Sequence, residues 1–131
     1  MNIIKTTLAL ERVLTSPIDP ELSRILTLRR DQLSENGHYV GGYAHFIIVG
    51  PGDRLADIEA AAGFPIAANI VDGIAYGQPG FEPSWESIDR HPGGTFELVF
   101  VLDDELATVV LVPDDPGIDP TLLQLCREFA M

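Results

Sequence analysis

Alternation of apolar and polar positions is clearest in the last third of the chain. Residues 95–102 (TFELVFVL) place Phe96, Leu98 and Phe100 on one side of an extended chain and Glu97 among valines on the other. A second apolar run, residues 107–112 (ATVVLV), follows a polar turn. These two runs predict a β-hairpin over residues 95–112. Since apolar residues occupy both faces of its first strand, we expect that strand to be central and covered on both sides.

Helical spacing of apolar residues predicts further elements. Residues 6–14 form a short helix, and a longer one begins at Pro20 and ends at Asn36-Gly37. Residues 54–62 form a helix that ends at Gly63, and residues 120–129 carry a strong apolar stripe. A carboxylate precedes three of these helices, where it accepts hydrogen bonds from the first free N–H groups. The predicted caps are Asp19, Asp53 and Asp119.

The middle of the chain is harder to interpret. Residues 44–49 (AHFIIV) predict a short buried strand, but residues 65–94 are rich in glycine and proline. Within them we expect a short strand inside residues 67–76 and a helix of one or two turns over residues 85–89, capped by Ser84. A loop-rich stretch of this length inside a small domain is more often functional than idle.

The order of these elements predicts one domain, residues 1–131, of the α+β class. We expect a small, partly antiparallel sheet of three or four strands, with the C-terminal hairpin 95–112 as its most secure part. About four or five helices should pack against this sheet.

The net charge of −12 is unevenly distributed. Residues 1–50 contain five acidic and five basic side chains, whereas residues 51–131 contain fifteen acidic and three basic ones. An acidic surface repels phosphate groups, so we expect no direct nucleic-acid binding. The acidity is compatible with a basic protein partner, with mimicry of nucleic acid, or with a surface that only promotes solubility.

Cysteine occurs once, as Cys126, which excludes an intrachain disulfide and fits a core position on the last helix. The N-terminal residues lack the apolar stretch of a signal peptide, and no apolar run is long enough to span a bilayer. We therefore expect a cytoplasmic protein that does not bind membranes. The hydrophobic content of 46% fits either a tight core or an apolar surface that a second copy covers in a homodimer.

Candidate chemistry is sparse. We find no catalytic, metal-binding or cofactor-binding motif. The pocket candidates are His45, His91 and Glu97, the last because it is the one acid inside a predicted buried strand. A buried carboxylate should be paired or have a raised pKa. Glu97 could instead lie on an exposed strand face, or form an ion pair with Arg90 or with an arginine from the N-terminal part.

Aromatic residues in the loop-rich segment are the remaining candidates. Tyr76, Phe81 and Trp85 fall within ten positions, among glycine, proline and acidic residues. Aromatic side chains on loops are common in protein interfaces. They serve equally to close a core where a loop folds over the edge of a sheet.

Three segments together resemble a group of small acidic bacterial proteins associated with alphaproteobacterial plasmids and other mobile elements. They are residues 81–86 (FEPSWE), residues 96–102 (FELVFVL), and Asp119-Pro120 with the leucines and Cys126 that follow. The resemblance covers most of the chain from about Leu14 and brings no known activity. It implies an accessory role, for which an inhibitor, antitoxin-like or immunity-like function would be natural.

The sequence thus favours a non-enzymatic protein-interaction domain that self-associates. The alternative is a small-molecule-binding or hydrolytic domain whose site lies between residues 65–94 and the sheet. A third hypothesis is an acidic nucleic-acid mimic or inhibitor, although several acids are explained as helix caps or turns.

Overall fold

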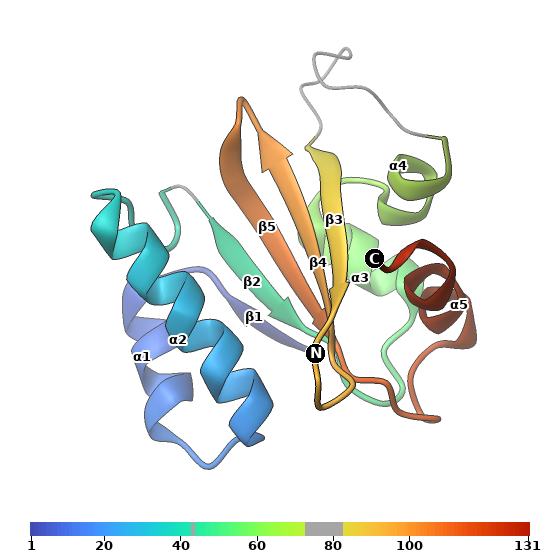
Figure 1. Cartoon of the computed structure of the whole chain (residues 1–131), viewed down its shortest axis with the longest axis horizontal. Coiled ribbons are helices and arrows are strands. Elements are labelled where there is room, and N and C mark those ends of the chain that lie inside the picture. The colour runs from blue at the N-terminus through green and yellow to red at the C-terminus, as the bar shows by residue number, and fades with distance from the viewer. Residues whose placement is uncertain (43, 73–82) are drawn as a thin grey trace.

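The computed structural model describes residues 1–42, 44–72 and 83–131. Its centre is a mixed five-stranded sheet in the order β1-β2-β5-β4-β3 (Figure 1). The β2–β5 pair is parallel and the other three pairs are antiparallel. The α+β class is therefore confirmed, with one or two strands more than we expected. The strands are β1 (Asn2–Ile4), β2 (His45–Ile48), β3 (Ser84–Arg90), β4 (Phe96–Leu102) and β5 (Glu105–Val112).

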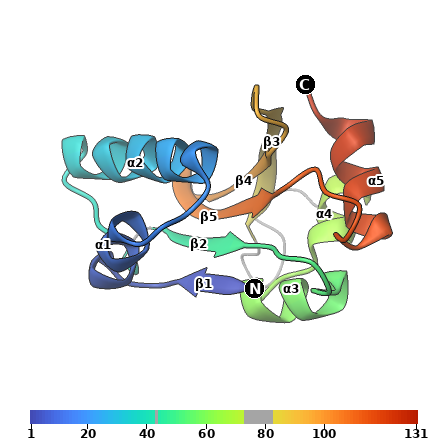
Figure 2. The same ribbon diagram turned by 90° about the horizontal axis from the view of Figure 1, so that it is seen from below.

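Helices cover both faces of the sheet (Figures 1 and 2). On one face lie α1 (Thr7–Thr15) and α2 (Pro20–Glu35). On the other lie α3 (Leu55–Ala62), α4 (Ile66–Asp72) and α5 (Pro120–Phe129). Each face has its own apolar core, because successive side chains of a strand point in opposite directions. In β2, for example, Phe46 joins the core under α1 and α2, and Ile47 joins the core under α3, α4 and α5.

The β4–β5 hairpin confirms the clearest prediction from the sequence. Leu102 pairs with Glu105, and the two residues between them, Asp103 and Asp104, both adopt positive φ angles of 54° and 59°. Two such residues are typical of the tight turn whose twist matches a hairpin. Strand β4 lies between β5 and β3, and its first five residues are buried. It is therefore the covered central strand that the apolar residues on both of its faces predicted.

The helix predicted over residues 85–89 is wrong, because these residues belong to strand β3. Trp85 and Ile88 both pack on the core under α3, α4 and α5, and their spacing of three residues is typical of a helix. In the strand, a β-bulge places Trp85 and Ile88 on the same face, because the pairing with β4 shifts between Trp85 and Ser87. One extra residue, Glu86, changes a period of two into a spacing of three.

The strand expected inside residues 67–76 is also wrong where the structure describes it. Residues 66–72 form α4, which buries Ile66, Asn69 and Ile70 at helical spacing. Asn69 is polar, which obscured this pattern in the sequence. Its side chain accepts a hydrogen bond from the Trp85 backbone N–H and donates one to the Pro83 carbonyl, so it ties α4 to β3.

The caps of α2 and α5 are the predicted ones, whereas the cap of α3 is not. The Asp53 carboxylate accepts hydrogen bonds from the Gly50 N–H and from the N-terminal ammonium, and Arg54 occupies the cap position without a side-chain hydrogen bond. The first N–H of α3, from Leu55, instead donates to Asp119 over 2.8 Å. Asp119 also accepts from the Thr121 N–H at 2.9 Å. One carboxylate thus caps both α3 and α5. The hydrogen bond from Leu55 contributes most to lowering the pKa of Asp119, and the bonds lower it although burial alone would raise it.

We predict that Asp119→Ala lowers the free energy of unfolding by about 2 kcal/mol, because a lost cap costs about 1 kcal/mol and two helices lose theirs. Asp19→Ala is the matched control, since Asp19 caps only α2. It should cost about half as much. Urea denaturation of the two variants measures the difference, and equal losses would contradict the shared cap.

Candidate functional site

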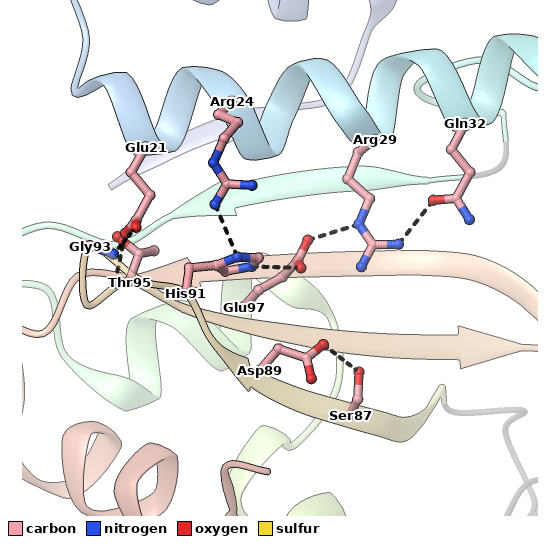
Figure 3. Close-up of polar contacts among 10 residues, drawn as sticks. All are labelled: Glu21, Arg24, Arg29, Gln32, Ser87, Asp89, His91, Gly93, Thr95 and Glu97. Atoms are coloured by element: carbon pink, nitrogen blue, oxygen red, sulfur yellow. Dashed lines mark hydrogen bonds and ion pairs between the residues drawn. The ribbon is translucent and has the colours of Figure 1, made fainter.

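On the α2-facing side of the sheet, polar residues join the apolar core at β4, where Glu97 lies on the same face as the buried Val99. The core under α1 and α2 includes Val109 and Leu111 of β5. On the same side, β4 presents Glu97, and β3 presents Asp89 directly opposite it, with Ser87 two residues away. Figure 3 shows side chains of α2 extending toward these strands. This junction of α2 with the β3–β4 hairpin contains Glu97, the one charged side chain among the buried polar residues of the described structure.

Glu97 is the buried charge at the centre of the junction, with only 4% of its surface exposed. Its Oε2 accepts a hydrogen bond from Arg29 Nε at 2.8 Å, and its Oε1 lies 3.0 Å from His91 Nε2. A buried carboxylate is tolerated when such partners neutralise and satisfy it. Both oxygens of Glu97 therefore have partners within the protein. Glu97 forms an ion pair with Arg29, and neither oxygen is free to act as a general base.

The hydrogen bonds around Glu97 also fix the tautomer of His91. Arg24 Nη2 lies 3.2 Å from His91 Nδ1. Because a guanidinium can only donate, Nδ1 must accept, and Nε2 then carries the proton that it donates to Glu97. A second donor of Arg29, Nη1, bonds to Gln32 at 3.0 Å (Figure 3). We call Glu21, Arg24, Arg29, His91 and Glu97 the polar seam.

Glu21 holds the turn between β3 and β4 against the start of α2. Its carboxylate accepts hydrogen bonds from the backbone N–H groups of Thr95, at 2.9 Å, and Gly93. A Cβ at Gly93 would collide with this carboxylate, so a larger residue at position 93 would require the Glu21 side chain to shift. Burial alone would raise the pKa of Glu21, but the bonds from Thr95 and Gly93 together outweigh it, and the pKa is lowered.

A small hollow opens beside the polar seam, with a volume of about 150 Å³. Sites for metabolites and drug-sized ligands usually occupy roughly 300–1,000 Å³. The hollow is therefore of the size of one amino-acid side chain. Its lining combines apolar and charged groups and consists of Ile25, Leu28, Arg29, Gln32, His91 and Glu97.

The structure brings together two of the three pocket candidates. His91 and Glu97 are in contact, whereas His45 points to the opposite side of the sheet and lies 3.4 Å from the Thr108 hydroxyl. Burial, assisted by the charge of Lys5, lowers the pKa of His45.

Of the interaction candidates, Tyr76 and Phe81 lie outside the described residues. Trp85 is half-buried and makes an edge contact with Phe129 of α5, with ring centroids 6.3 Å apart. Trp85 thus packs on the core under α3, α4 and α5, on the side of the sheet away from the polar seam.

Residues of α2 were missing from the candidates. Arg24 contacts His91, and Arg29 contacts both Glu97 and Gln32, although in the sequence these residues look like an ordinary solvated helix face. The need of a buried Glu97 for a cation was the available signal, and an N-terminal arginine was one of the options. Arg90, the other option, pairs instead with Asp114 at 3.0 Å.

Neither groups of metal-ligating side chains nor the Cys126 thiol give a further candidate site in the described part of the chain. Among the described residues, no three histidine, cysteine, aspartate or glutamate side chains are grouped as metal ligands would be. Burial, and secondarily the charge of Asp114, raises the pKa of Cys126 to about 12, as expected of a core thiol. No helix in the described ranges is both long and apolar enough to cross a membrane.

The comparisons with known proteins give no relative. No family model matches the chain, no curated protein is significantly similar to it, and no solved structure matches its fold significantly. The resemblance to mobile-element proteins stays a prediction. Functional inference therefore rests on the polar seam and the surface around it.

We predict that Arg29→Ala lowers the free energy of unfolding by about 3 kcal/mol, because it leaves the buried Glu97 with His91 alone. The double variant Arg29→Met with Glu97→Leu removes both charges and should recover most of this loss. Urea denaturation measures both. Arg30→Ala is the control, since Arg30 pairs with the exposed side chains of Glu11 and Asp31, and it should cost less than about 1 kcal/mol. An Arg29→Ala loss as small as this control would contradict the buried ion pair.

We further predict a pH-dependent effect of Glu21→Gln. A lowered pKa in the folded state means that the ionised carboxylate stabilises the fold above the ordinary glutamate pKa of 4.5. This contribution disappears as the pH falls through the lowered pKa. The variant should therefore be less stable than the wild type at pH 7, by about 1 kcal/mol for the weakened charge-assisted bonds, and the difference should shrink as the pH falls below 4.5. Thermal unfolding at a series of pH values tests this, and a difference that grows toward low pH would refute it.

Proposed function

We propose that this chain is a protein-interaction domain that binds a protein partner on the surface between α2 and β3. This α2–β3 surface consists of Arg24, Leu28 and Gln32 on α2 and Ser87 and Asp89 on β3. The observation that carries the proposal is the 150 Å³ hollow, whose size suits one inserted side chain. Interfaces commonly depend on a few such anchor side chains in preformed pockets.

Exposed apolar surface at the rim of the hollow supports this proposal. Leu28 lines the hollow and is 56% exposed, although the same helix buries Ile25, Leu26 and Leu33. An apolar rim beside satisfied charged groups is the composition of an interface centre, where water is excluded around a few polar contacts. The ion pair of Arg29 and Glu97 would already be ordered before the partner binds, which lowers the entropic cost of association.

A small-molecule-binding domain is the second candidate, because His91 and Glu97 line the same hollow. Two features weigh against it. The volume is below that of ordinary ligand sites, and both carboxylate oxygens of Glu97 are engaged by protein partners. A native mass spectrum that retains a ligand, and loses it in Glu97→Gln, would favour this candidate instead.

Site-specific photo-crosslinking in cells tests the protein-interaction function. A photoreactive amino acid at position 28 should give an adduct of discrete mass, because Leu28 would lie inside the interface. The same probe at position 124 is the control, since Gln124 is exposed on α5, on the other face of the sheet. No adduct at position 28, or equal adducts at both positions, would contradict the proposed surface.

A further inference from the structure

The α2–β3 surface carries two charges of opposite sign that lack an ion-pair partner within the described part of the chain. Arg24 is exposed, and its polar contact is with the neutral ring of His91. Asp89 is half-buried, and its polar contact is with the Ser87 hydroxyl at 3.3 Å. Figure 3 shows Arg24 extending from α2 and Asp89 standing on β3, on the same side of the sheet. A partner that offers one acid and one base could satisfy both.

A second copy of this chain offers that pair. In a dimer with two-fold symmetry the same patch is used twice, so that a contact of residue i with residue j is matched by one of j with i. We infer that two copies associate through their α2–β3 surfaces, with Arg24 of each copy facing Asp89 of the other. This inference rests on the proposed protein-interaction function and names its partner.

The charge distribution favours this face for self-association. Two chains of net charge −12 repel each other, and the repulsion is smallest where the surface is least acidic. Residues 1–50, which include α1 and α2, contain equal numbers of acidic and basic side chains, whereas the remainder carries the whole excess. Docking through α2, which carries three acidic and three basic side chains, therefore avoids most of this excess.

The edge of β3 is a less suitable interface than its face. An open strand edge invites pairing with a second sheet through its backbone groups. Here the Asn69 side chain occupies the backbone groups of Pro83 and Trp85, and the Met131 N–H donates to the Ile88 carbonyl at 2.9 Å. Several of the backbone groups that a second strand would need are thus engaged, and the side chains of the α2-facing side remain.

A charge-exchange experiment tests the pairing by sedimentation velocity over a concentration series, supported by native mass spectrometry. The wild type should form a dimer. Arg24→Asp and Asp89→Arg should each weaken dimerisation about 10- to 100-fold, because each puts like charges opposite one another twice in the symmetric interface. The double variant, Arg24→Asp with Asp89→Arg, restores the opposite charges, and its dissociation constant should return to within about 3-fold of wild type.

Controls separate this inference from the proposed function. Arg12→Asp makes the same charge change on α1, outside the α2–β3 surface, and should leave the dimer unchanged. Asp89→Asn keeps the shape of residue 89 and should weaken the dimer even if Asp89→Arg fails to fold, as judged by circular dichroism. A monomeric wild type, or a double variant no better than the single ones, overturns the second-copy inference. A crosslink from position 28 to a different protein would then leave the proposed function standing, whereas no crosslink at all would remove both.

Discussion

The position of α2 on the sheet depends on one buried carboxylate. Glu97 lies on a central strand, where an unpaired charge would cost several kcal/mol. Its charge is neutralised when α2 brings Arg29 to one oxygen, and the His91 ring of the β3–β4 turn satisfies the other oxygen. Apolar packing alone would tolerate small shifts of the helix along the sheet, whereas the directional bonds to Glu97 select one position. Glu21 adds a second tether at the start of α2, through the backbone of the same turn.

The two faces of the sheet are therefore held in different ways. On the side of α3, α4 and α5, buried apolar residues extend as far as the edge strand β3, in which Ile88 is fully buried. On the side of α2, β4 contributes the buried Val99 beside the charged Glu97, and a polar contact of Arg29 joins the helix to β4. Polar contacts leave room for groups that a tightly packed core would exclude. Polar contacts in place of apolar packing account for the small hollow, for the exposed Leu28 and for the half-buried Asp89.

Much of the fold could be predicted from the sequence, because hairpins and capped helices are local. The spacing of apolar residues, the turn residues and the caps predict the 95–112 hairpin, α2 and α5. The wrong predictions concern elements whose structure or cap depends on residues far away in the sequence. A bulge gives β3 the apolar spacing of a helix, and α4 is joined to β3 through Asn69, a polar residue in a core position. Asp119 caps α3 from 64 positions further along the chain. The need of Glu97 for a cation was evident, but its choice of Arg29 depends on how α2 lies on the sheet.

The same features determine how an assembly of this chain would end. A domain with a free sheet edge can add copies without limit, since each added strand presents a new edge. In this fold one of the two sheet edges, that of β3, is engaged by Asn69 and by Met131, and β1 forms the other edge. Pairing by two-fold symmetry through the α2–β3 surface uses that surface in both copies, and the net negative charge of the pair repels further copies. The strong acidity of residues 51–131 would then act less as a binding site than as the feature that limits association to a pair.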